Sequence, residues 1–108
     1  MKAILYSSNA DDAFEEIFAY SLEHWGLAGA ERYLDRIRSK LNALARGEPP
    51  HARSCEVLMR GSRDSAGLCY CIEGSHVIFL RESPNEIEVV DVVHQSRNIE
   101  AEIDRLLG

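Results

Sequence analysis

The sequence predicts an α+β fold: an N-terminal strand, an antiparallel helical hairpin packed on a largely antiparallel sheet of about four strands, and a short C-terminal helix. Three observations lead to this prediction. Two β-branched runs, residues 76–82 and 86–94, flank a tight turn, and a third β-run at 68–73 comes directly before them. Two stretches with helical spacing fill residues 9–46. Because strands joined by short turns pair antiparallel, the two helices are left to cover one face of the sheet.

The hairpin of residues 76–94 is the part of the chain around which the other elements are arranged. Its turn is Ser83-Pro84-Asn85, in which proline fixes φ and asparagine tolerates a left-handed conformation. The second strand, 86–94, holds the densest run of Val and Ile in the chain. We therefore expect it to be a central strand.

The N-terminal part predicts a strand followed by two helices. Residues 2–6 are typical of an edge strand, and residues 7–9 offer side-chain oxygens that cap a helix N-terminus. Gly26 ends the first predicted helix, with Trp25 expected to pack down onto the core, and Gly47 ends the second. A connection this short forces the helices antiparallel. Their apolar stripes are Ala10, Ala13, Phe14, Ile17, Ser21 and Trp25, and Ala30, Tyr33, Leu34, Ile37, Leu41 and Leu44.

The remaining segments are less regular. Residues 48–66 are rich in Pro, Gly, Ser and Arg and are predicted to be a loop, although a short helical or extended turn around residues 55–59 is an alternative. Apolar side chains at helical spacing predict a short C-terminal helix after residue 98, with Asn98 or Ser96 as its cap.

Size and composition predict a single domain spanning residues 1–108. The contents of 45% hydrophobic and 28% charged residues are ordinary for a globular protein. No apolar run approaches the roughly 20 residues of a membrane helix, and the first residues lack the apolar core of a signal peptide. We therefore expect a cytoplasmic protein that does not bind membranes.

The three cysteines are expected to be small, buried, reduced thiols. Cys69 and Cys71 would share one face of a strand, but neither they nor the four histidines have the spacing of a tetrahedral metal site. The chain also lacks a nucleophile elbow and a phosphate-binding glycine loop. The sequence thus predicts no metal, no cofactor and no catalytic cluster.

The formal net charge of −6 bears on the possible partners. A protein that grips a nucleic-acid backbone usually needs a basic field, because counterion release supplies most of its non-specific affinity. We therefore expect no direct sequence-specific nucleic-acid binding.

Arg81, His94 and Arg97 are the best candidates for a polar site at the strand ends. The turn places Arg81 opposite about residue 87, and His94 lies seven positions farther, or about 23 Å at about 3.3 Å per residue. Arg81 and His94 are thus predicted at opposite ends of the hairpin, which argues against one compact catalytic centre. The alternative for His94 is a hydrogen bond at a strand terminus, with Arg97 in solvent.

A basic ridge is predicted on the outer face of the second helix, where Arg32, Arg36 and Lys40 follow at i, i+4 and i+8. Asp35 could pair with Arg32 or Arg38, and the basic and acidic side chains of this solvent-exposed face would then neutralise one another. The functional alternative is a docking rim for an acidic segment of a partner.

Three segments resemble the signatures of ParE-type toxins in the ParE/RelE superfamily: EHWGLAGAERYLDRI (23–37), GSHVIFLRE (74–82) and IEVVDVVHQSRN (87–98). Members typically carry Trp-Gly before an Ala-rich helix with Tyr, a G-x-H-V-I-F-x-R strand, and a last strand closing in V-x-H-x-x-x-(N/D). The three occur here in that order over essentially the whole chain. The family fold, a helical hairpin on an antiparallel sheet, agrees with the pattern of the elements.

The resemblance implies the toxin of a type II toxin–antitoxin pair: a hetero-oligomer in which the C-terminal segment of a cognate antitoxin wraps the toxin. ParE toxins block DNA gyrase, so it also implies an interaction toxin without catalytic chemistry, with a role in plasmid stabilisation. The candidate target-binding residues are Arg81, His94, Gln95, Arg97 and Asn98, and the candidate antitoxin-binding residues are Arg32, Arg36, Lys40, Arg60 and Arg63.

Two alternatives are open. RelE relatives cut mRNA on the ribosome with a basic site of Arg and Lys, and often Tyr or His; here His94 would be the general acid or base, and Arg81 or Arg97 would steady the phosphate. The acidic balance, the presence of only two lysines and the lack of a Tyr after Tyr70 depart from that pattern and favour gyrase inhibition. The other alternative is an inactive relative that only titrates antitoxin.

Overall fold

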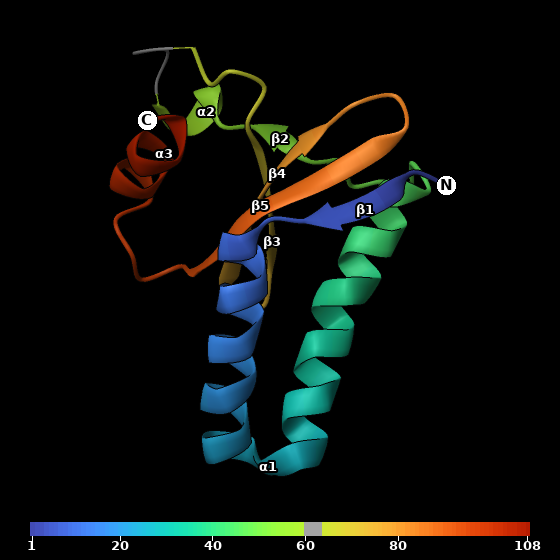
Figure 1. Ribbon diagram of the computed structural model, residues 1–108, viewed down its shortest axis with the longest axis vertical. Coiled ribbons are helices and arrows are strands. Elements are labelled where there is room, and N and C mark those ends of the chain that lie inside the picture. The colour runs from blue at the N-terminus through green and yellow to red at the C-terminus, as the bar shows by residue number, and fades with distance from the viewer. Residues whose placement is uncertain (60–63) are drawn as a thin grey trace.

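The computed structural model describes residues 1–59 and 64–108. Its described part contains a five-stranded sheet with the order β1-β5-β4-β3-β2 (Figure 1). β1 pairs parallel with β5, and the other neighbours are antiparallel. The predicted α+β arrangement with a largely antiparallel sheet is confirmed. The strands are β1 (Ala3–Tyr6), β2 (Arg53–Ser54), β3 (Cys69–Glu73), β4 (His76–Glu82) and β5 (Glu86–His94).

The β4–β5 hairpin has the bounds that its sequence predicted. The backbone N–H of Ser83 donates to the carbonyl of Glu86 at 2.9 Å and closes the turn. β5 lies between β1 and β4, as expected for a central strand. The pairing is interrupted by a β-bulge between Phe79 and Leu80, which shifts the register of everything beyond it.

α1 (Ser8–Ala45) contains the predicted helical hairpin: its two halves run antiparallel and meet at Gly26 (Figure 1). Gly26 has φ 76° and ψ 178°, which lies outside the helical region. Glycine adopts this conformation more readily than residues with a side chain do. The Ser7 hydroxyl accepts the N–H of Ala10 at 3.0 Å and caps the N-terminus. None of the helices in the described residues combines the length and apolarity that a bilayer crossing requires.

Both faces of the sheet are buried. α1 packs on one face, and α2 (Glu56–Met59) and α3 (Ile99–Leu107) cover the other. In β4, Ile78 and Leu80 contribute to the core under α1, whereas Val77 and Phe79 contribute to the core under α2 and α3. The C-terminal end of β5 therefore leaves the sheet between α1 on one side and α3 on the other.

The segment between α1 and β3 is more regular than predicted. Residues 53–54 form β2 and residues 56–59 form α2, in a segment that was predicted to be a loop. α2 matches the alternative of a short helical turn around residues 55–59. Cys55 is fully buried, and its N–H donates to the carbonyl of Leu68 at 3.0 Å. Burial of a few apolar side chains and pairing with β3 thus order a segment whose composition is typical of loops.

The predicted buried thiols are confirmed in two of three cases, because Cys55 and Cys71 are buried and Cys69 is partly exposed. Burial raises the pKa of Cys55 to about 12 and that of Cys71 to about 11. Both therefore stay protonated and unreactive at neutral pH.

Candidate functional site

The β4–β5 register brings two histidines together at the end of the sheet away from the hairpin turn. His76 pairs with His94, and their rings meet edge to face with centroids 5.4 Å apart. Without the bulge between Phe79 and Leu80, the register nearer the turn would pair His76 with Val93 instead. The bulge is therefore what places the two imidazoles side by side.

Tyr33 reaches this histidine pair from the second half of α1. Its hydroxyl is hydrogen-bonded to Nδ1 of His76 at 2.5 Å and accepts the backbone N–H of Ser75 at 3.2 Å. Gly74 makes room for the phenol: it has φ 58°, and a Cβ there would lie 2.7 Å from Cε1 of Tyr33. These contacts fix α1 to the turn between β3 and β4.

The two imidazoles differ in their surroundings. Burial, followed by the charge of His94, lowers the pKa of His76 from 6.5 to about 4, so this ring is neutral at physiological pH. His94 is exposed, and its Nδ1 accepts the backbone N–H of Ser96 at 3.0 Å. A neutral His94 ring therefore carries its proton on Nε2.

A second polar cluster joins β5 to α3. Asp91 is 7% exposed; one of its oxygens accepts from Arg105 at 2.7 Å and the other accepts the N–H of Val92 at 2.8 Å. Arg105 also donates to Glu102 at 2.6 Å, and Arg97 approaches the same carboxylate at 3.5 Å. The hydrogen bonds to Asp91 and then Glu102 raise the pKa of Arg105. This cluster holds α3 against the sheet.

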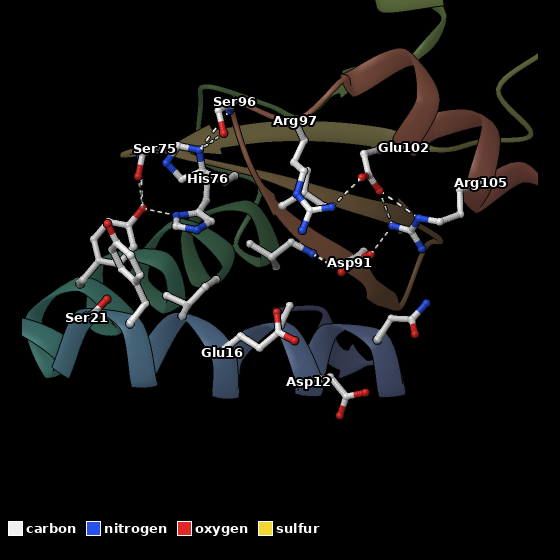
Figure 2. Close-up of a pocket in the computed structure, with 18 of the residues that line it drawn as sticks. Asp12, Glu16, Ser21, Ser75, His76, Asp91, Ser96, Arg97, Glu102 and Arg105 are labelled. Carbon is white, nitrogen blue, oxygen red and sulfur yellow. Dashed lines mark hydrogen bonds and ion pairs between the residues drawn. The ribbon is translucent and has the colours of Figure 1, made fainter. Parts of the chain in front are cut away.

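Both clusters line one groove of about 870 Å³, which lies between α1 and the C-terminal end of β5 (Figure 2). That volume lies within the range of small-ligand sites. Asp12 and Glu16 lie on the α1 side, and Arg97 and Arg105 lie on the side of α3. In the described part of the chain the groove is lined by four carboxylates and two guanidinium groups, so its charge is negative when the histidines are neutral.

The groove offers hydrogen-bonding and acid–base groups. Tyr33, His76 and His94 could exchange a proton with a bound group. The two arginines that line the groove could orient that group through hydrogen bonds. Within residues 1–59 and 64–108, no group of three or more His, Cys, Asp and Glu side chains could hold a metal ion.

Comparison with known proteins places these features in a family. The sequence model of the ParE toxin of the type II toxin–antitoxin system parDE matches residues 4–99. The chain belongs to the ParE toxin family. Toxin ParE1 of Caulobacter vibrioides is 30% identical over 103 residues, which are 95% of this chain and 99% of that toxin. Toxin ParE1 of Mycobacterium tuberculosis is 30% identical over 97 residues, 89% of this chain and 92% of that toxin.

A solved structure agrees with the fold. The structure titled "Chromosomal ParDE TA system from P. aeruginosa" superposes with a TM-score of 0.60 and covers 87% of this chain and 96% of that one. At 13% sequence identity this likeness shows the ParE fold alone. The resemblance inferred from the three sequence segments is confirmed.

Of the five candidate target-binding residues, His94 and Arg97 line the groove of this ParE family member. Arg81 lies far from them, opposite Glu88, and its Nε donates to the carbonyl of Ala66 at 3.2 Å. The predicted separation of Arg81 and His94 is thus confirmed. The other two serve structure at the strand end: the Gln95 N–H donates to the carbonyl of Ser75 at 2.8 Å, and the Asn98 side chain caps α3 by accepting the N–H of Ala101 at 3.1 Å.

The candidate antitoxin-binding residues fall into three groups. Arg36 donates to Glu73 of β3 at 3.0 Å, so part of the predicted ridge is tied to the sheet. Arg32 is exposed and Lys40 is partly buried, and neither forms an ion pair within the described residues. Arg60 and Arg63 lie outside the described residues.

Sequence reasoning missed several residues of the groove. For His76, the G-x-H-V motif was the only sequence feature that pointed to a role in the site. Tyr33, Asp91 and Arg105 reach the site through tertiary packing. The expectation for Trp25 was wrong: its side chain is 55% exposed and lines the groove instead of packing into the core. The helix reverses at Gly26, so the preceding residue lies at the exposed tip of the hairpin.

Proposed function

We propose that this ParE family member is the toxin of a type II toxin–antitoxin pair and inhibits DNA gyrase by contact, without catalytic chemistry of its own. The family match over residues 4–99 carries the proposal. The negative charge of the groove supports a protein target, because its carboxylates repel the phosphates of a nucleic acid. Gyrase acts on DNA inside the cell, so the proposed place of action is the cytoplasm.

The surface that we assign to the target is the end of β5 and the residues after it. His94, Gln95 and Arg97 are exposed there. The Arg97 side chain is 66% exposed, and its contact with Glu102 is long at 3.5 Å, so little stability is lost when it turns toward a partner. In this proposal these side chains make contacts and do not transfer protons.

The antitoxin is proposed to wrap the helical hairpin and the open edge of the sheet. β1 is an edge strand, and its Leu5 and Tyr6 side chains are 46% and 39% exposed. An extended segment could add to this edge by backbone pairing. Arg32 and Lys40 remain available for an acidic part of the same segment. The resulting complex is a hetero-oligomer.

One observation favours a second candidate function, a ribosome-dependent mRNA endonuclease. The Tyr33–His76–His94 cluster brings three acid–base groups together, and Arg97 lines the same groove. His94 would act as general acid or base, and Arg97 would stabilise the charge on the phosphate. This function would require RNA to enter a groove whose charge is negative.

Expression of the chain in cells without a cognate antitoxin distinguishes these functions. We expect growth arrest with halted DNA synthesis and intact transcripts, and recovery when the antitoxin is co-expressed. Transcript cleavage that disappears in His94→Ala would select the endonuclease instead. Normal growth at a verified level of folded protein would contradict both and leave a relative that only titrates antitoxin.

A further inference from the structure

Ser21 carries a buried hydroxyl that has no hydrogen-bond partner in the described part of the chain. Its side chain lies in the first half of α1, is 1% exposed, and lines the groove. No side-chain nitrogen or oxygen of residues 1–59 and 64–108 is both sealed from solvent and unpaired, so the Ser21 hydroxyl keeps an opening, which the groove provides. Buried polar groups are nearly always satisfied, so this hydroxyl is suited to a hydrogen bond with a polar atom of a ligand.

The indole of Trp25 lies one helical turn beyond Ser21, on the same face of α1. It is 55% exposed and lines the groove. Gly29 gives it room, because a Cβ at that position would lie 2.6 Å from Cβ of Trp25. Its ring meets the ring of Tyr33 edge to face, with centroids 5.8 Å apart. The indole is therefore an exposed aromatic wall held in a defined place, of the kind that contributes strongly to protein–protein binding.

Three more aromatic rings line this end of the groove. Tyr33, His76 and His94 follow one another with ring centroids 5.5 and 5.4 Å apart. Figure 2 shows Ser21 at the end of the groove where His76 lies, and Asp12 at the other end. The buried hydroxyl is thus surrounded by aromatic rings and not by the carboxylates. We call this part of the groove the aromatic end; it is lined by Ser21, Trp25, Tyr33, His76 and His94.

We propose that the aromatic end binds a tyrosine side chain of the target protein, with the ring against Trp25 and the hydroxyl hydrogen-bonded to Ser21. Tyrosine combines a flat apolar ring, which packs edge to face or offset on other aromatic rings, with a hydroxyl that needs a partner when it is buried. Phenylalanine would fill the same space and leave the Ser21 hydroxyl unpaired, which costs free energy.

The aromatic end is continuous with the surface that we assign to the target. His94 belongs to both, and Arg97 lines the same groove. A segment of gyrase that contacts these two residues can therefore place a tyrosine in the aromatic end. The identity of the partner rests on the proposed function, whereas the chemistry of the site does not.

The probe for this site is N-acetyl-tyrosine amide, titrated into the full chain. Trp25 is the single tryptophan, so the NMR signal of its indole N–H reports on the aromatic end directly. We expect a saturable shift with a dissociation constant of about 1 mM, as is usual for a good ligand of this size. N-acetyl-phenylalanine amide lacks the hydroxyl and should bind about three- to tenfold more weakly. Nucleobases also stack on aromatic rings, so tighter binding of adenosine than of the tyrosine probe would overturn the assignment to a protein side chain.

The variant that isolates the hydroxyl is Ser21→Ala. It should bind the tyrosine and phenylalanine probes equally, because one hydrogen bond gives the preference for tyrosine. Ser39→Ala removes an exposed hydroxyl from the second half of α1 and should keep the preference. Three results would overturn the site: a tyrosine preference that survives in Ser21→Ala, equal binding of the two probes to the wild type, or the absence of any shift in correctly folded protein.

The assignment of the tyrosine to gyrase has a separate test. In a supercoiling assay, Ser21→Ala should inhibit gyrase about three- to tenfold more weakly than the wild type, and Ser39→Ala should inhibit it as strongly. Equal inhibition by all three proteins would overturn the assignment to gyrase while leaving the tyrosine site in place. A wild-type toxin that leaves gyrase active would contradict the proposed function, and the probe titrations would still decide the site, so the two failures are distinguishable.

Discussion

Tyr33 and His76 lie 43 residues apart in the sequence and are joined by a 2.5 Å hydrogen bond between the phenol oxygen and Nδ1 of the imidazole. The same oxygen accepts the Ser75 N–H, and the Tyr33 side chain is almost fully buried. One hydroxyl thus connects the helical hairpin to the β3–β4 turn and sets the position of the histidine pair. The first two predictions follow from this contact.

Removing the hydroxyl of Tyr33 should destabilise the fold. In Tyr33→Phe, His76 and Ser75 lose a partner at a buried position, so the free energy of unfolding should fall by about 1–3 kcal/mol. Urea denaturation measures this change. The control is Tyr20→Phe, whose ring is 58% exposed and whose hydroxyl makes no hydrogen bond within the described residues. Equal stabilities of the two variants would show that the Tyr33 hydroxyl contributes nothing.

Stability should fall as the pH drops from 6.5 toward 4. An unfolded histidine takes up its proton near pH 6.5, whereas folded His76 does so only near pH 4, so acid favours the unfolded state across this interval. Allowing for partial exposure, the loss should be about 1–3 kcal/mol. His76→Gln should flatten this part of the profile, and His51→Gln in the exposed loop should not. A His76→Gln profile as steep as that of the wild type would contradict the lowered pKa.

Adding a methyl group at Gly74 should be far more costly than at Gly47. Both glycines have positive φ, 58° and 75°, so alanine is strained at each. Only at Gly74 would the new Cβ also meet Tyr33, at 2.7 Å, whereas nothing lies within 4 Å at Gly47. Gly74→Ala should therefore lose about 1–3 kcal/mol more stability than Gly47→Ala. Thermal unfolding of both variants measures the difference, and similar midpoints would mean that the phenol moves freely.

Truncating Arg105 should loosen α3, whereas truncating Arg97 should not. Arg105 is the counter-charge of Asp91, which is 7% exposed and would be left buried without it. Because the Arg105 side chain is itself half exposed, the expected loss for Arg105→Ala is about 1–3 kcal/mol. Arg97→Ala removes a long, exposed contact and should change stability by less than about 0.5 kcal/mol. Hydrogen exchange of the α3 amides should rise in the first variant only.

Local pattern was sufficient to predict much of the fold. The alternation of β-branched residues and the Ser83–Asn85 turn predicted both strands of the hairpin to the residue, and Gly26 marked the reversal of the helices. β2 was missed, and α2 was predicted only as an alternative to a loop, because their order comes from burial of Cys55 and pairing with β3, which composition does not report. The parallel pairing of β1 with β5 is likewise a tertiary property.

The site was predictable only where it lies on one element. His94 and Arg97 stand at a strand end that the sequence marked as polar. His94 pairs with His76 only because of the one-residue bulge between Phe79 and Leu80. A hairpin without this bulge would have paired His76 with Val93. The α1 wall, with Asp12 and Glu16, joins the groove only once the helical hairpin docks on the sheet.

The central claim, inhibition of gyrase by contact, is tested most directly by DNA supercoiling with purified gyrase and purified toxin. We predict loss of supercoiling or accumulation of cleaved DNA. Inhibition should be weaker for the doubly substituted His94→Ala, Arg97→Ala variant and unchanged for His51→Ala. Messenger RNA in a translation reaction with the same preparation should stay intact. Full supercoiling by gyrase at micromolar excess of folded toxin, with transcripts cut on the ribosome, would contradict the account and make His94 a catalytic residue.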